Sequence, residues 1–139
     1  MGRKGIMAWL VSGVAINLWA LLTCAWLTRW VYRVEPIYIF REWTRDFTPM
    51  YGFLSVVNNF IFAGLFVFLY AVICKSLQGS GARKGLIFGF LVWLAGWAVS
   101  WVRVAITINI SKALFVDWMV NGLISYMIAG AIIGWIYRE

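Results

Sequence analysis

Four long apolar segments divide this chain of 139 residues and limit what it can fold into. They cover about residues 6–31, 52–77, 83–109 and 117–137. An α-helix needs about 20 apolar residues to cross the hydrocarbon core of a bilayer, and each segment is long enough. The chain is 64% apolar and 12% charged, whereas soluble domains are about 45–50% apolar and about 25% charged. The sequence therefore predicts an all-α fold, a four-helix transmembrane bundle that forms a single domain over residues 1–139 in contact with the lipid bilayer.

The connections between these segments differ in length. The longest, over residues 32–51, alternates charged and aromatic side chains between Pro36 and Pro49. This pattern predicts a short interfacial amphipathic helix in the headgroup plane, or else an aromatic surface that docks a partner subunit. The connections at 78–82 and 110–116 are short turns, which predict antiparallel neighbours. Since the first apolar segment is long and lacks a small-residue cleavage site, we expect a retained helix rather than a signal peptide.

The basic residues lie near the ends of the predicted helices and form no nucleic-acid-binding patch, although the net charge is +7. Arg3 and Lys4 precede the first segment. The first helix usually sets the orientation under the positive-inside rule, so we expect both termini in the cytoplasm. The Lys and Arg residues are nearly balanced between the two predicted sides, which keeps dual topology as an alternative.

The third segment carries a narrow stripe of small and polar residues when its residues are placed at steps of about 100°. The stripe consists of Gly85, Gly89, Val92, Gly96, Ser100, Arg103 and Thr107. Small residues mark the packing faces of membrane helices, because lipid tails are as apolar as Leu. The stripe therefore predicts the face that meets other helices, with Arg103 pointing inward. Gly130 and Gly134 give the fourth segment a similar small-residue spacing, for packing within the bundle or between protomers.

Polar residues at membrane depth define a candidate ligand-binding site. They are Asn17, Asn58, Asn59, Arg103, Asp117 and Asn121. A rise of about 1.5 Å per residue places Asn17 near the midplane and the others in the outer half, with Asp117 at the mouth. An intramembrane ionisable residue indicates a functional site, here a pocket for an anionic or carbonyl-bearing ligand such as a lipid headgroup or quinone, or else a conduction path.

The same residues have structural interpretations. Arg103 can snorkel to the headgroups or pair with Asp117 as a clamp. The asparagines can hydrogen-bond between helices. Trp93, Trp97 and Trp101 step by four beside the stripe, which predicts core or intersubunit packing, or stacking on a ring-shaped ligand such as a quinone.

Several kinds of chemistry are not expected. The chain has no His, the commonest metal ligand, and we expect neither a metal nor a cofactor. It has no paired intramembrane carboxylates and no Cys-x-x-Cys motif, and we expect no acid deep enough in a span to couple protons to export. Cys24 and Cys74 fall in opposite predicted leaflets, which argues against a disulfide. The sequence therefore predicts a protein that is not an enzyme.

The second half of the chain resembles a group of uncharacterised small bacterial integral membrane proteins of similar length. The matching residues are 69–71, 79–94 and 129–139. The resemblance implies a four-helix fold in the bacterial cytoplasmic (inner) membrane, and it implies no chemistry.

Three functional hypotheses follow. The first is a non-enzymatic subunit or scaffold of a membrane complex, or a homo-oligomer, because Trp and Gly lie on more than one helix side. The second is a small transporter or channel for anionic or small polar solutes that uses Arg103 and the asparagines. The third is binding of a lipid or a quinone in the outer half of the bundle.

Overall fold

A computed structural model describes residues 2–23, 49–107 and 111–137, and these residues are almost entirely helical. The elements are α1 (Arg3–Thr23), α3 (Pro49–Ile73), the 3-10 turn η2 (Cys74–Ser76), α4 (Gly81–Val92), the π-helix η3 (Trp93–Ala98), α5 (Val99–Thr107) and α6 (Lys112–Ile136). Because α4, η3 and α5 continue one another, the described residues form four helices that are long and apolar enough to cross a membrane. The predicted all-α, four-helix membrane fold is confirmed. The predicted amphipathic segment and Cys24 lie outside the described residues.

The fourth helix begins earlier than the sequence suggested. We expected a turn over 110–116, whereas α6 begins at Lys112. Ser111 caps it, because its side-chain Oγ accepts a hydrogen bond from the backbone N–H of Leu114 at 3.1 Å. This is the usual role of Ser at an N-cap, where it satisfies one of the unpaired N–H groups of the first turn. The predicted turn is therefore wrong from residue 112 onward, and Asp117 lies inside a helix.

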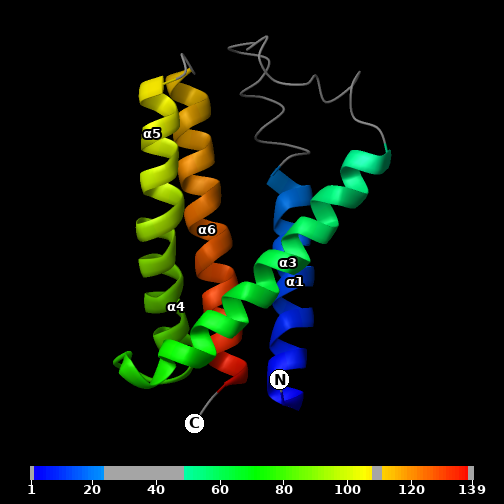
Figure 1. Cartoon of the computed structure of the whole chain (residues 1–139), viewed down its shortest axis with the longest axis vertical. Coiled ribbons are helices and arrows are strands. Elements are labelled where there is room, and N and C mark those ends of the chain that lie inside the picture. The colour runs from blue at the N-terminus through cyan, green and yellow to red at the C-terminus, as the bar shows by residue number, and fades with distance from the viewer. Residues whose placement is uncertain (1, 24–48, 108–110, 138–139) are drawn as a thin grey trace.

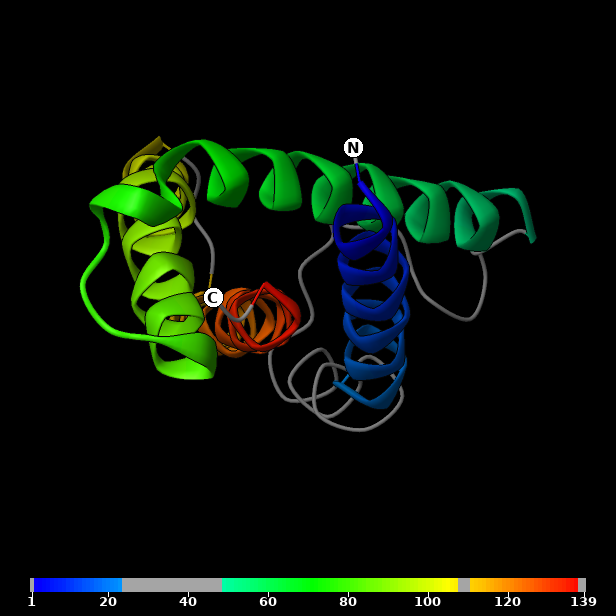
Figure 2. The ribbon, with the colours of Figure 1, turned by 90° about the horizontal axis from the view of Figure 1, so that it is seen from below.

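Helix α6 stands at the centre of the bundle, between α4 and α1 (Figure 2). Helix α3 runs along one side of this row and slants across α1 (Figure 1). The start of α1 and the end of α6 lie at the same end of the molecule (Figure 1). An even number of spans gives this result, and it agrees with termini on one side of the membrane.

Helices α4 and α6 touch backbone to backbone through glycines. A β-carbon on Gly85 or Gly89 would overlap the carbonyl groups of Gly130 and Tyr126, and a β-carbon on Gly134 would lie 2.5 Å from the carbonyl oxygen of Gly81. Only glycine allows this approach, which brings many atoms of the two helices into van der Waals contact. Gly85, Gly89, Gly130 and Gly134 thus lie at one helix contact, whereas Gly96 faces open space.

The π-helix η3 changes which face of the third span turns inward. A π-helical turn holds one more residue than an α-helical turn, so the residues after it are displaced around the axis. Ala98 is buried and Trp101 is partly buried, whereas Gly96, Ser100 and Arg103 are exposed. Within the single chain, the prediction that the whole stripe meets other helices is wrong in its outer half, where Gly96, Ser100, Arg103 and Thr107 are exposed.

Aromatic contacts account for this displacement. The indole N–H of Trp97 donates to the backbone oxygen of Trp118 on α6 at 3.1 Å. The rings of Trp101 and Trp118 lie 4.3 Å apart between centroids. Burying large indole rings against α6 gives more contact than burying Gly96 and Ser100 would, because dispersion attraction grows with the number of atom pairs.

Helix α3 packs mainly through its second half. Ala63, Phe66, Val67 and Tyr70 are its buried residues, and the rings of Phe66 and Tyr70 lie 4.7 and 5.1 Å from that of Phe88 on α4. Nearer its start, α3 is tied to α1, because the indole N–H of Trp9 donates to the carbonyl oxygen of Phe60 at 2.7 Å.

Candidate functional site

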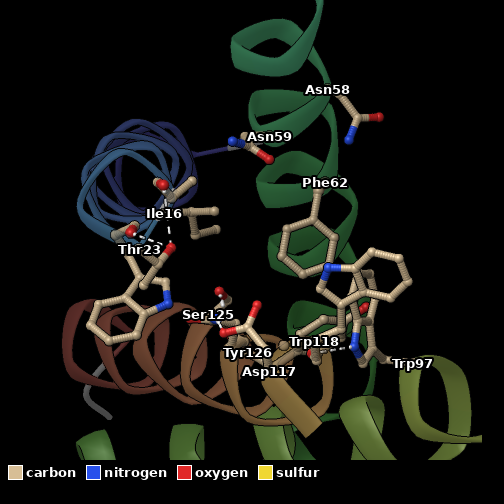
Figure 3. Close-up of a pocket in the computed structure, with 14 residues that line it drawn as sticks. Ile16, Thr23, Asn58, Asn59, Phe62, Trp97, Asp117, Trp118, Ser125 and Tyr126 are labelled. Atoms are coloured by element: carbon tan, nitrogen blue, oxygen red, sulfur yellow. Dashed lines mark hydrogen bonds between the residues drawn. The ribbon is translucent and has the colours of Figure 1, made fainter. Parts of the chain in front are cut away.

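A cavity of about 390 Å³ opens between α1, α3, η3 and α6 (Figure 3). Its polar lining residues are Thr23, Asn58, Asn59, Asp117, Asn121 and Ser125. Its aromatic walls come from Trp19, Phe62, Trp97, Trp118 and Tyr126. The cavity therefore joins polar side chains from three of the spans with aromatic surface, at a depth where the other faces of these helices are apolar.

The cavity exists because of two features of the fold. Helix α3 slants away from α6 toward its start, beyond the contact of its second half with Phe88 (Figure 1). The π-helix turns Trp97 toward α6, where its indole covers Gly122 so closely that a β-carbon there would overlap the ring. The slant opens the space and the Trp97 indole forms one wall of it.

Asp117 lies on the α6 wall and only 6% of it is exposed. The side-chain Nδ2 of Asn121, one helical turn further, donates to Asp117 Oδ1 at 2.7 Å. A hydrogen bond donated to a carboxylate stabilises its negative charge. We expected Asp117 at the start of the fourth helix, whereas it lies inside α6, because Ser111 starts the helix early, and its side chain is buried.

The asparagines of α1 and α3 meet at the opposite wall. Asn59 Nδ2 donates to Asn17 Oδ1 at 3.0 Å, and Asn17 Nδ2 donates to the Gly13 carbonyl oxygen at 2.8 Å. Asn58 is exposed, yet it also lines the cavity. The structure thus brings Asn58, Asn59, Asn121 and Asp117 around one space, with Asn17 bonded directly behind Asn59.

Arg103 is not part of this cluster. Its side chain is exposed on α5 and does not line the cavity. Arg103 and Asp117 are both described, and no ion pair joins them, so the structural clamp is not formed. The displacement at η3 explains this, since a continuous α-helix would carry Arg103 to the side facing α6.

Sequence reasoning missed most of the aromatic wall and two hydroxyls. Trp97 was noted for its spacing, but Phe62, Trp118 and Tyr126 look like any aromatic residue in an apolar span. Thr23 and Ser125 bond to their own helices, through the carbonyl oxygens of Trp19 at 2.9 Å and of Asn121 at 2.8 Å. No spacing pattern distinguishes such hydroxyls from lipid-facing ones.

Within residues 2–23, 49–107 and 111–137, no three His, Cys, Asp or Glu side chains gather closely enough to hold a metal ion. No family model, no curated protein and no solved structure matches this chain. The resemblance noted in the second half is therefore supported only as far as the four-helix membrane fold, and the cavity has to be interpreted from its own residues.

Proposed function

We propose that this chain is a non-enzymatic, multi-pass membrane protein that holds a small polar solute in the cavity between α1, α3 and α6, as a small transporter does. The cavity itself carries the proposal. Its volume of about 390 Å³ falls within the range of about 300–1,000 Å³ typical of ligand pockets. Polar side chains within a membrane span raise the free energy of the protein unless they have hydrogen-bonding partners, and they mark solute pathways.

The position of Arg103 favours small polar solutes over anionic ones. An anionic ligand would need Arg103 or another cation at the site, and Arg103 is exposed outside the cavity. Among the described residues, no Lys or Arg lines the cavity to neutralise an anion.

We place the protein in a bacterial cytoplasmic membrane with both termini in the cytoplasm. The bacterial assignment comes from the resemblance of the second half. The orientation is supported by Arg3 and Lys4 at the start of α1, because the first helix usually sets the orientation. Thiol labelling of single cysteines in intact cells tests this orientation. Labelling of either terminus from outside the cell would contradict it.

Mass spectrometry of bound molecules tests the cavity as a binding site. The full chain is purified from native membranes in mild detergent, and the retained molecules are identified. Ser125→Phe fills the cavity, whereas Ser100→Phe adds the same ring to an exposed serine of α5. Both serines donate to the carbonyl oxygen four residues earlier, so the pair is closely matched.

We expect the wild type and Ser100→Phe to retain the same solute and Ser125→Phe to lose it. Equal retention by all three proteins, or retention by none, contradicts the proposal. A retained lipid or quinone lost only from Ser125→Phe would identify the solute as that class instead.

A second candidate is a subunit of a membrane complex or a homo-oligomer. It is favoured by the outer half of the stripe, where Gly96, Ser100 and Arg103 are exposed in the single chain. Small and polar residues on a lipid-facing surface suit contact with another helix. Size measurement in mild detergent tests this; a monomer with no co-purifying protein contradicts it.

A further inference from the structure

We infer that the solute carries a neutral group that both accepts and donates hydrogen bonds, a carboxamide or a hydroxyl, joined to a flat apolar part, and that Trp19 donates to its oxygen. This inference rests on the proposed binding function and specifies the chemical class of the solute. Three features of the cavity carry it: a donor without a partner, acceptors without partners, and aromatic surface.

Trp19 on α1 is the donor without a partner. It lines the cavity, and its Nε1 atom is buried and has no hydrogen-bond partner among the described residues. An indole N–H can donate but cannot accept. A buried donor without a partner raises the free energy of the folded protein, and native structures pair nearly all such groups with protein, water or ligand. A group that pairs with Trp19 must therefore carry an acceptor.

The indole of Trp93 shows why the position of Trp19 matters. Its Nε1 atom is also buried without a partner in the described part of the chain, but Trp93 does not line the cavity. An unpaired indole is therefore not enough to indicate a ligand. Trp19 differs because it borders a space of about 390 Å³ that other unpaired polar groups also line.

Two amide oxygens on the other walls are the acceptors without partners. Asn59 on α3 donates through Nδ2 to Asn17, and Asn121 on α6 donates through Nδ2 to Asp117. Among the described residues, no donor is directed at the side-chain oxygen of Asn59 or of Asn121. An amide oxygen can accept two hydrogen bonds. A group that pairs with these oxygens must therefore carry a donor.

The other hydrogen-bonding groups of the lining do not change this balance. The hydroxyls of Thr23 and Ser125 donate to carbonyl oxygens of their own helices, and the indole N–H of Trp97 donates to α6. The amide of Asn58 and the hydroxyl of Tyr126 can each donate and accept, so they fit either kind of partner.

A group with both a donor and an acceptor satisfies all of these walls. An ammonium group has donors only and would leave Trp19 unpaired. A carboxylate or a ketone has acceptors only and would leave the amide oxygens of Asn59 and Asn121 without donors. A neutral group also loses less hydration free energy than an ion when it enters a membrane span. A carboxamide or a hydroxyl has this combination.

The aromatic walls suit the remainder of such a molecule. The ring centroid of Tyr126 lies 4.9 Å from that of Phe62 and 6.1 Å from that of Trp97. Figure 3 shows these three rings bordering the same space. Aromatic side chains bury a large apolar area and stack on flat rings. A flat apolar part can therefore pack here while the polar group meets Trp19.

Four probes of nearly the same shape test the inference. Benzamide donates and accepts, benzamidinium only donates, and benzoate and acetophenone only accept. Binding to the purified full chain in detergent is followed by NMR titration of the tryptophan indole N–H signals. We expect benzamide to bind about tenfold or more tightly than each other probe, because each of those leaves a buried group unpaired. This comparison uses the wild type, so it needs no variant to fold.

The indole signal of Trp19 reports the contact directly. It is identified by its absence in Trp19→Phe, and we expect it to move downfield when benzamide binds, as an N–H group does on forming a hydrogen bond. The indole of Trp97 already donates to the Trp118 oxygen, so its signal should move less and shows that each variant is folded. Binding of benzamide without a shift of the Trp19 signal contradicts the inference.

Two matched variants locate the preference. Trp19→Phe keeps an aromatic ring and removes the N–H group. We expect its affinity for benzamide to fall about tenfold, while its affinity for benzamidinium stays the same. Trp93→Phe makes the same change outside the cavity and should leave all four affinities unchanged. Equal effects of the two variants contradict the inference.

The outcomes separate this inference from the proposed function. If another probe binds as tightly as benzamide, if Trp19→Phe keeps the preference, or if no probe binds, the assigned solute class is wrong. The retained molecules decide the proposed function separately. Loss of a retained solute from Ser125→Phe alone keeps the cavity as a binding site, and equal retention by Ser125→Phe and the wild type overturns both.

Discussion

Gly85 on α4 lies against the backbone oxygen of Gly130 on α6, and a β-carbon on either glycine would overlap the backbone of the other helix. The overlap involves main-chain atoms, which cannot rotate away as a side chain can. The contact sets the distance between the two helices and places the α6 wall, with Asp117 and Asn121, relative to η3.

Replacing Gly85 by Ala should therefore destabilise the bundle. Overpacking a tight contact costs about 1–3 kcal/mol, and the backbone overlap at Gly85 places this variant toward the upper part of that range. Gly96→Ala is the control on the same span, because a β-carbon there meets nothing within 4 Å. Thermal unfolding in detergent gives the midpoint temperature of each variant. Equal midpoints for Gly85→Ala and Gly96→Ala would show that the α4–α6 contact is looser than described.

Removing the amide of Asn59 should weaken the attachment of α3 to α1. Asn59→Ala loses the hydrogen bond to Asn17, and interhelical hydrogen bonds in membranes contribute about 0.6 kcal/mol on average. Asn58→Ala is the neighbouring control, since Asn58 is exposed. A double-mutant cycle with Asn17→Ala isolates the pair. Zero coupling would show that the two amides do not depend on each other.

Deleting Leu94 should be tolerated, because η3 holds one residue more than an α-helix needs. Shortening it by one gives a continuous α-helix that keeps Gly85, Gly89 and Trp101 on their present faces. Val120 in α6 is equally exposed, at 45% against 47% for Leu94. Its deletion should turn one part of α6 by about 100° relative to the other and unfold the bundle. Circular dichroism and size in detergent show whether each deletion variant is folded. Loss of the fold only in the Leu94 deletion would contradict this interpretation.

Removing the hydroxyl of Ser111 should loosen the start of α6. Ser111→Ala is expected to cost about 0.5–2 kcal/mol, as other N-cap substitutions do, and Ser111→Thr should retain most of the stability. Ser100→Ala is a control, because its hydroxyl is exposed and bonds within its own helix. Hydrogen exchange at the amide of Leu114 reports the cap directly, and unchanged protection in Ser111→Ala would show that the cap is unimportant.

Replacing Arg103 by Ala should change stability by less than about 0.5 kcal/mol, as at most exposed sites away from special features. Arg103 is exposed and lies one turn from the end of α5, where its long side chain can reach the headgroups. Chemical denaturation in detergent measures the change. A loss of several kcal/mol would mean that Arg103 has a partner in the folded chain.

The fold could be predicted from sequence because segment length and hydropathy alone define membrane spans. The spacing of Gly85, Gly89, Gly130 and Gly134 predicted close helix contacts, within the bundle or between protomers, but it did not predict that α4 and α6 would contact each other. The exposed position of Arg103 was not predicted, because the stripe assumed a uniform period of 3.6 residues per turn. One π-helical turn breaks that period, and its cause is contact between Trp97 and Trp118, residues that are distant in sequence.

The candidate site was also predicted only in part. Asn58, Asn59, Asn121 and Asp117 were identified because polar residues are rare in such spans. Their depth depended on where α6 begins, and the cap at Ser111 moved that point by five residues from the predicted start at 117. The aromatic walls depend on how α3 slants, which is set by packing rather than by any local pattern.

Helix α3 and its 3-10 extension span 28 residues, from Pro49 to Ser76, or about 42 Å at the rise of an α-helix. This exceeds the hydrocarbon thickness of about 30 Å, and a long span accommodates the mismatch by leaning. The second half of α3 is anchored by Phe66 and Tyr70 against Phe88, so leaning carries its first half, with Asn58 and Asn59, away from α6. A thin bilayer therefore widens the cavity and a thick one narrows it, which makes lipid chain length a variable that changes the space between α3 and α6.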